Sequence, residues 1–208
     1  MKNFILFFAL LMASLSATAS NQYVCKCDAG ASAACAANVG SNTNSGTSAS
    51  SPKRDLPTSV SGFSGNDTLF LCTGGSWVTS NGFVNSTNFG ATTPFKINWY
   101  APTTGCDVSC ANTKPIISCT AADCTVINYG IGGAASNKNG FAMSNVELSC
   151  KGASGVTAGV GISGDSNYFT LNNFYIHDCG FGVISTGFLA SQGSTNSSSV
   201  ADILGVRV

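Results

Sequence analysis

The chain has little charge, a single histidine and no long helical pattern. Of its 208 residues only 9% are Asp, Glu, Lys or Arg, and the nine basic and nine acidic side chains give a formal net charge of zero. This composition gives no electrostatic reason to expect nucleic acid or an anionic membrane as a partner. After residue 19, apolar residues nowhere recur at helical spacing over ten or more positions, which argues against a long amphipathic helix. What is present is abundant Gly, Ser, Asn and Thr between short apolar segments.

The N-terminus has the three parts of a secretory signal peptide. Met1 and Lys2 precede an apolar run over residues 4–15, and Ala17 and Ala19 form a small-residue cleavage site. The run is too short to span a bilayer, and no later segment approaches that length. We therefore expect a signal peptide over residues 1–19 and a secreted, extracellular protein (periplasmic if bacterial) with no membrane span.

All ten cysteines follow the predicted cleavage site. An even number in an exported chain predicts disulfides, up to five, with a connectivity that sequence alone does not give. Close pairs such as Cys25/Cys27 suggest zinc as the alternative, but a single histidine and the lack of paired C-x-x-C motifs favour disulfides. The candidates are Cys25, Cys27, Cys35, Cys72, Cys106, Cys110, Cys119, Cys124, Cys150 and Cys179.

Composition divides the mature chain into two parts. Residues 20–61 are rich in Cys and then in Gly, Ser and Asn, and they are interpreted as an entry segment. Residues 62–208 contain short apolar runs separated by turn residues, a pattern typical of strands. Among the expected strands are residues 67–72, 94–100, 115–119 and 124–128.

Two stretches repeat each other at an offset of 28 residues. Residues 141–150 align with residues 169–178, and each copy is a strand, a bend with Asn145 or Asn173, and a second strand. Such a repeat predicts stacked coils, in which each inward residue packs on its equivalent about 4.8 Å away. An asparagine ladder is expected at the bends, because a short amide bonds backbone groups there. The expected inward stacks are Met143 on Leu171 and Leu148 on Ile176.

A second match aligns residues 158–164 with residues 180–186 at an offset of 22. Together the two matches predict three strands in each coil, which favours a parallel solenoid over an antiparallel sandwich. The second match also predicts that Ile162 stacks on Ile184. The expected fold class is therefore all-β, a parallel β-helix with about six coils of about 25 residues and little helix.

Three parts of the sequence carry a resemblance to a known family. They are Tyr23-Val24 with residues 40–52, residues 65–71 with 74–77, and the coil pattern of residues 161–184. Together they resemble the right-handed parallel β-helix proteins of the pectate lyase superfamily. The resemblance implies a right-handed coil and covers nearly the whole mature chain. Because residues 202–206 look like the start of another coil, we expect the β-helix of residues 62–208 to be incomplete at its C-terminus.

The resemblance implies a protein that acts on or binds polysaccharide. The first expectation is a lyase that cleaves an acidic glycan such as pectin by elimination, with Lys or Arg as the base and Ca²⁺ as a possible cofactor held by Asp. No residue matches a catalytic motif of the superfamily, so catalytic and metal-binding residues stay unassigned and enzymatic activity stays open. The alternatives are a noncatalytic glycan-binding or adhesin-like module and an inactive fragment.

Four residues are candidate substrate-binding positions, each with a structural alternative. Asp165 follows a strand expected to line the groove but also fits a turn. Lys151 lies in an extra loop, and Tyr175 offers an aromatic ring for a sugar or for packing. His177 is the only histidine, but adjacent strand residues point to opposite faces, so we expect Asp178 not to share its site. The repeat also predicts no pair of outward carboxylates for a hydrolase.

Overall fold

The computed structural model describes most of the chain between residues 20 and 204. Strands dominate it, and no α-helix occurs among the described residues. None of them forms a helix with the length and apolarity needed to cross a membrane. The described residues are 20–29, 31–32, 35, 38–58, 60, 62–80, 82–85, 89, 92–102, 113–129, 139–163, 167–186 and 201–204.

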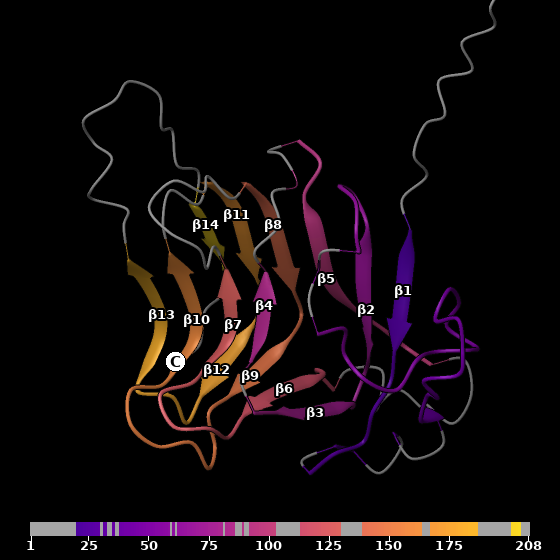
Figure 1. The fold of residues 1–208 in the computed structure, drawn as a ribbon, viewed down its shortest axis with the longest axis horizontal. Coiled ribbons are helices and arrows are strands. Elements are labelled where there is room, and N and C mark those ends of the chain that lie inside the picture. Colours follow the sequence, from indigo (N-terminus) through magenta and orange to yellow (C-terminus); the bar gives the residue numbers. More distant parts are fainter. Residues whose placement is uncertain are drawn as a thin grey trace, which may run out of the picture.

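The strands form three sheets, and every strand pairing between them is parallel (Figure 1). Sheet A has six strands, in the order β1 (Asn21–Val24), β2 (Thr68–Cys72), β5 (Phe95–Tyr100), β8 (Asn139–Ser144), β11 (Asn167–Asn172) and β14 (Ala201–Leu204). Sheet B has β3 (Ser76–Thr79), β6 (Ile116–Cys119), β9 (Glu147–Ser149) and β12 (Tyr175–His177). Sheet C has β4 (Phe83–Asn85), β7 (Thr125–Tyr129), β10 (Ala158–Ser163) and β13 (Phe181–Thr186).

From β2 onward the chain visits the sheets in a fixed order, A then B then C, before it returns to A. We call one such passage a circuit. Consecutive circuits pair strand on strand, as in β8 with β11 and β9 with β12. The 28-residue offset of the sequence repeat is the register of these two pairings, in which Phe141 lies beside Phe169 and Glu147 beside Tyr175.

Inward side chains form rows that run from circuit to circuit. The predicted neighbours Met143 and Leu171 are register partners, as are Leu148 and Ile176, and all four are buried. Burial of one such side chain contributes roughly 1.5–3 kcal/mol. The row in sheet A contains Leu69, Ile97, Met143 and Leu171, and the row in sheet B contains Trp77, Ile117, Leu148 and Ile176.

The predicted register in sheet C is wrong by one residue. Ile162 pairs with Ser185, and Ile184 pairs with Gly161. The register is set at the start of β13, where the backbone N–H of Phe181 donates to the Thr157 carbonyl. A shift of one residue in register moves every side chain of a strand to the opposite face. Because β10 has two glycines and few large side chains, its register with β13 depends on the hydrogen bond at the turn.

Asparagine side chains form the predicted ladder where sheet A turns into sheet B. Asn173 Nδ2 donates to Asn145 Oδ1 at 2.7 Å, and Asn145 Nδ2 donates to Asn98 Oδ1 at 3.0 Å. Asn145 and Asn173 have φ of 61° and 48°, in the left-handed region that asparagine tolerates better than most residues. The ladder therefore joins three successive circuits at one corner.

The residues of the entry segment that follow β1 pack at the same end of the sheets as β1. Cys25 is bonded to Cys72 and Cys27 to Cys35, which ties this segment to the end of β2. The backbone N–H of Lys53 donates to the Tyr23 carbonyl, and further on Trp77 Nε1 donates to the Arg54 carbonyl at 3.1 Å. The inward Trp77 is thus covered by a loop without regular strands.

Candidate functional site

Sheet B presents two rows of side chains on its outer face, away from the apolar core. One row contains Val78, Ser118, Ser149 and His177, and the other contains Ser76, Ile116, Glu147 and Tyr175. Ser76 and Ser149 are buried by neighbouring segments. Adjacent strands are about 4.8 Å apart, so the first row spans about 14 Å across the four strands. The candidate site lies at the β9–β12 end of these rows, where the ionisable and aromatic side chains gather.

His177 lies between two carboxylates. Its Nε2 is 2.8 Å from Glu147 Oε1, and its Nδ1 is 2.8 Å from Asp178 Oδ2. The ring of Tyr175 stacks on the imidazole, with centroids 4.9 Å apart and planes inclined by 21°. We call Glu147, Tyr175, His177 and Asp178 the histidine cluster.

Strand register explains most of the histidine cluster. His177 pairs with Ser149, so Glu147, two residues earlier on β9, is its diagonal neighbour on the same face. Tyr175 and His177 are two residues apart on β12 and share that face. Asp178 directly follows β12 and has a φ of 57°.

The expectation that Asp178 and His177 cannot share a site is wrong. Alternation of faces applies within a strand, but the left-handed backbone of Asp178 ends it and the carboxylate reaches the ring. The expectation of no outward carboxylate pair is also wrong, because Glu147 and Asp178 flank one imidazole. Their bonded oxygens are roughly 7 Å apart, the span of the ring plus two hydrogen bonds.

The histidine cluster is rich in hydrogen-bond acceptors and partly open to solvent. The side chains of Glu147 and His177 are 23% and 25% exposed, and that of Asp178 is 50% exposed. A protonated imidazole donates to both carboxylates at once, whereas a neutral one has a single N–H. Each carboxylate retains acceptor sites beyond its bond to His177, so the cluster can accept hydrogen bonds from a hydroxyl-rich ligand.

The four predicted binding residues are only partly brought together. Tyr175 and His177 belong to the histidine cluster, while Asp165 lies outside the described residues. Lys151 is exposed in the turn after β9 and has no ion pair with any described residue. The disulfide between Cys150 and Cys179 ties its turn to the residues that follow Asp178.

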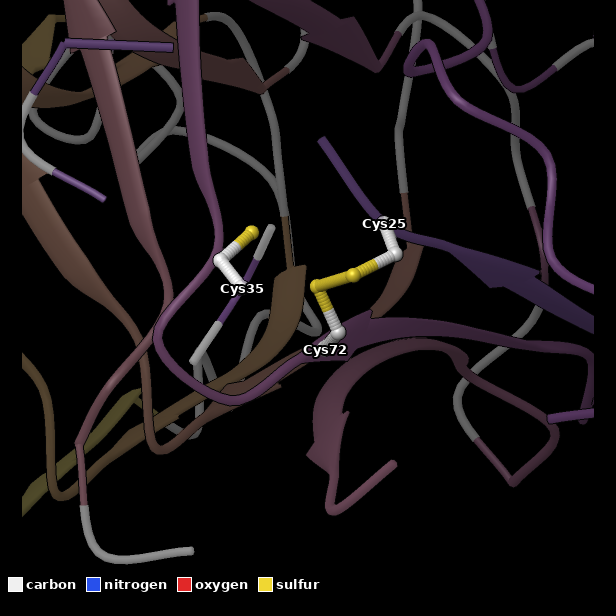
Figure 2. A group of neighbouring side chains, drawn as sticks. All are labelled: Cys25, Cys35 and Cys72. Carbon is white, nitrogen blue, oxygen red and sulfur yellow. A yellow bond between two sulfur atoms is a disulfide. The ribbon is translucent and has the colours of Figure 1, made fainter. Parts of the chain in front are cut away.

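The described cysteines form disulfides and are therefore not free to bind zinc as thiolates. Cys25–Cys72, Cys27–Cys35, Cys119–Cys124 and Cys150–Cys179 are paired, and Cys106 and Cys110 lie outside the described residues. Figure 2 shows the Cys25–Cys72 bond with the sulfur of Cys35 beside it, and the three sulfurs lie within 4.8 Å of one another. Zinc binds thiolates, and these sulfurs are all in disulfides.

Sequence reasoning missed Glu147 as a partner of His177. The signal was present in the 28-residue repeat, which places Glu147 beside Tyr175 and therefore diagonal to His177. The chain matches no protein-family model, no curated protein and no solved structure.

Proposed function

We propose that this protein is an exported, right-handed parallel β-helix that binds polysaccharide on the outer face of sheet B. The observation that carries the proposal is the histidine cluster, an exposed aromatic ring fixed beside two carboxylates. Aromatic faces suit the C–H side of a sugar ring, and carboxylates accept hydrogen bonds from its hydroxyls. The noncatalytic glycan-binding function is thus the one that the geometry supports best.

Two features support the β-helical and exported parts of the proposal. The cyclic order of the three parallel sheets and the asparagine ladder are what stacked coils require. The signal-like N-terminus and the disulfides fit an oxidising compartment outside the cytosol. A linear glycan laid along the outer rows of sheet B would cross successive coils and meet an equivalent position in each.

Tyr175 has the central role in this proposal. Its side chain is exposed, and the stacked imidazole of His177 limits the orientations that the ring can take. The two carboxylates hold that imidazole from both sides. A ring that is ordered before binding loses less conformational entropy when a sugar packs on it, which raises affinity.

Binding of soluble oligosaccharides, followed by isothermal titration calorimetry, tests the proposal. We expect Tyr175→Ala to weaken binding about tenfold, a loss of about 1.4 kcal/mol. Phe181→Ala is the matched control, because Phe181 is also an exposed aromatic residue but begins β13 in sheet C. Equal effects of the two substitutions, or no binding of neutral or acidic oligosaccharides by the parent protein, would contradict the proposal.

A second candidate function is elimination on an acidic glycan, and one observation favours it. The Cys150–Cys179 bond joins the turn of Lys151 to that of Asp178, so a cation without an ion pair to any described residue and a carboxylate lie on adjoining turns. In its neutral form the Lys151 amine would take the proton beside the uronate carboxylate. The C–O bond to the leaving sugar would then break, a C=C bond would form, and the leaving oxygen would gain a proton.

Incubation with polygalacturonate and Ca²⁺ separates this candidate from binding alone. The unsaturated product absorbs in the ultraviolet, so its appearance reports elimination directly. We expect Lys151→Met to abolish the product while retention on the polysaccharide persists, and Lys96→Met, at an exposed lysine on β5, to change neither. A flat trace from the parent protein would exclude the lyase and leave the binding function in place.

A further inference from the structure

Asp67 is the one ionisable side chain that is buried among the described residues. It directly precedes β2 in sheet A and is only 4% exposed. It forms no ion pair with the side chain of any described residue. Burying a carboxylate is costly unless a cation or hydrogen-bond donors replace the lost water, so the groups around Asp67 need an explanation.

Two backbone N–H groups donate to the Asp67 carboxylate. The N–H of Ser64 donates to Oδ2 at 2.7 Å, and that of Ser20 donates to Oδ1 at 2.6 Å. The first bond is local to the turn before β2, whereas the second joins positions 47 residues apart in sequence. Ser20 is held there by the pairing of β1 with β2, because its carbonyl accepts the N–H of Thr68 at 3.3 Å.

Ser20 is also the residue that follows the predicted signal-peptide cleavage site at Ala19. While the signal peptide is attached, the Ser20 nitrogen belongs to a neutral amide with a single N–H. After cleavage the same nitrogen is an α-ammonium, which is positively charged at neutral pH and has three N–H donors. Ser20 is exposed, so the donors that do not face Asp67 remain in water.

We propose that Asp67 is the buried counter-ion of the α-ammonium that cleavage creates at Ser20. Hydrolysis by a signal peptidase breaks the bond between Ala19 and Ser20. Water supplies the hydroxyl of the new Ala19 carboxyl group and a proton of the amine, which takes up a further proton from solvent. The neutral hydrogen bond at Asp67 then becomes an ion pair with a charge-assisted hydrogen bond, which is about twice as strong.

The ion pair couples removal of the signal peptide to the stability of sheet A. In the precursor, β1 is attached at this point by a neutral hydrogen bond, so its pairing with β2 is weaker than in the mature chain. The geometry also selects the cleavage position. Cleavage one residue earlier would leave the Ser20 nitrogen as an amide, and cleavage one residue later would remove it. This inference goes beyond glycan binding and does not depend on it.

A one-residue insertion tests the inference on the exported, mature protein. N-terminal sequencing of the parent should give Ser20 as its first residue. A Gly inserted between Ala19 and Ser20 moves the charge by one residue and should lower the thermal unfolding midpoint by about 4 °C. The same insertion in Asp67→Asn should lower it by less than about 1 °C, because no buried charge is left to pair.

Asp123→Asn is the matched control for the insertion. The Asp123 carboxylate also accepts a backbone N–H, that of Val156 at 2.6 Å, but it is exposed and lies at another turn. In this background the insertion should still lower the midpoint by about 4 °C. Sequencing of each variant confirms that it begins at the inserted glycine.

The pH dependence of the insertion effect is a second measurement, and it needs no substitution at Asp67. The pKa of an α-amine is about 8 in an unfolded chain, and a carboxylate partner raises it in the folded protein. The stabilisation is therefore present below about pH 8 and is lost as the pH rises through the raised pKa. The insertion effect should be full at about pH 6 and absent by about pH 10. The other titratable side chains of β1, β2 and β5 are Tyr23, Lys96 and Tyr100, and both proteins contain them.

Three results would overturn the inference. The first is a parent protein whose mature chain does not begin at Ser20. The second is an insertion effect of the same size in Asp67→Asn as in the parent. The third is an insertion effect that does not change between acidic and alkaline pH, which also decides the question if Asp67→Asn does not fold.

Discussion

The entry segment and the circuits are held together by different interactions. The described part of residues 20–60 contains one regular strand, the Cys27–Cys35 disulfide, a second disulfide that leads out to Cys72, and a charged group centred on Asp55. The circuits from β5 to β13 repeat the same inward rows and the same corner asparagines. The circuits are stabilised by the same packing and hydrogen bonds repeated from one circuit to the next. The entry segment depends on a few contacts between residues far apart in sequence.

This difference explains where the pattern of apolar residues at inward strand positions is interrupted. Within the circuits, inward positions such as Leu148 and Ile176 are apolar and buried. In the entry segment, one inward position of β1 carries Gln22 and the other carries the buried Val24, and two clefts touch residues 53–58. Irregular segments placed on a regular scaffold are where binding sites tend to occur, and here the entry segment provides the clefts.

The largest expected effect comes from the disulfides, which exist in both regions. Replacing Cys25 and Cys72 with Ser should lower the free energy of unfolding by about 4 kcal/mol, because the bond closes a long loop in the unfolded chain. The same substitutions at Cys150 and Cys179 should lower the free energy of unfolding by about 0.4 kcal/mol less. The reason is that Cys150 and Cys179 are 29 residues apart in sequence, whereas Cys25 and Cys72 are 47 apart. Urea unfolding of both double variants measures the difference.

Limited proteolysis of these variants sharpens the comparison. Without the Cys25–Cys72 bond, we expect cleavage to begin within residues 38–58, where regular pairing is absent. Without the Cys150–Cys179 bond, β9 and β12 still pair, so protection of the circuits should persist. First cleavage within the circuits of both variants would show that the two regions unfold together.

A smaller effect is expected at the asparagine ladder. Asn145→Ala should lower the free energy of unfolding by about 2–3 kcal/mol, because it removes two side-chain hydrogen bonds and leaves at a φ near 61° a residue that tolerates this region less well than asparagine. Asn145→Gly removes the same bonds but tolerates that φ, so its loss should be about 1 kcal/mol smaller. Thermal unfolding of both variants separates the amide from the backbone contribution. Equal losses would contradict the role given to the left-handed conformation.

The smallest expected effect is the acid sensitivity of the entry segment. The pKa of Asp55 is lowered to about 2 in the folded protein, against about 4 in an unfolded chain. Its stabilisation is therefore complete above pH 4 and is lost as the pH falls toward 2. Because its side chain is 39% exposed, the change should stay below about 1 kcal/mol. Asp55→Asn should flatten the pH dependence of unfolding in this window, and an unchanged profile would contradict the assignment.

Sequence predicts the circuits far better than the entry segment. The stacks of Met143 with Leu171 and Leu148 with Ile176, and the ladder through Asn145 and Asn173, follow from a repeat in which every copy faces the same environment. The predicted register in sheet C is wrong by one residue, because the two glycines of β10 leave that strand with few large side chains to fix the register.

The candidate site is predicted only in part. Tyr175 and His177 were expected to face outward, but the approach of Asp178 depends on a left-handed backbone that no periodic pattern indicates. The Cys25–Cys72 bond, and the cleft around Gln22 and Lys53, arise from contacts between an irregular loop and the strand end. Such contacts have no periodic signature in sequence.

The asparagine ladder also determines where the fold can change its length. At the ladder corner, β8 joins β9 and β11 joins β12 through two residues each, because each asparagine must meet the one in the neighbouring circuit. The next corner is joined by the Cys150–Cys179 bond, which leaves residues 151–156 outside the linked positions, and there the connection from β9 to β10 spans residues 150–157 while that from β12 to β13 spans only 178–180. Insertions engineered at the second corner should therefore be tolerated, which makes it the natural place to graft a new loop beside the histidine cluster.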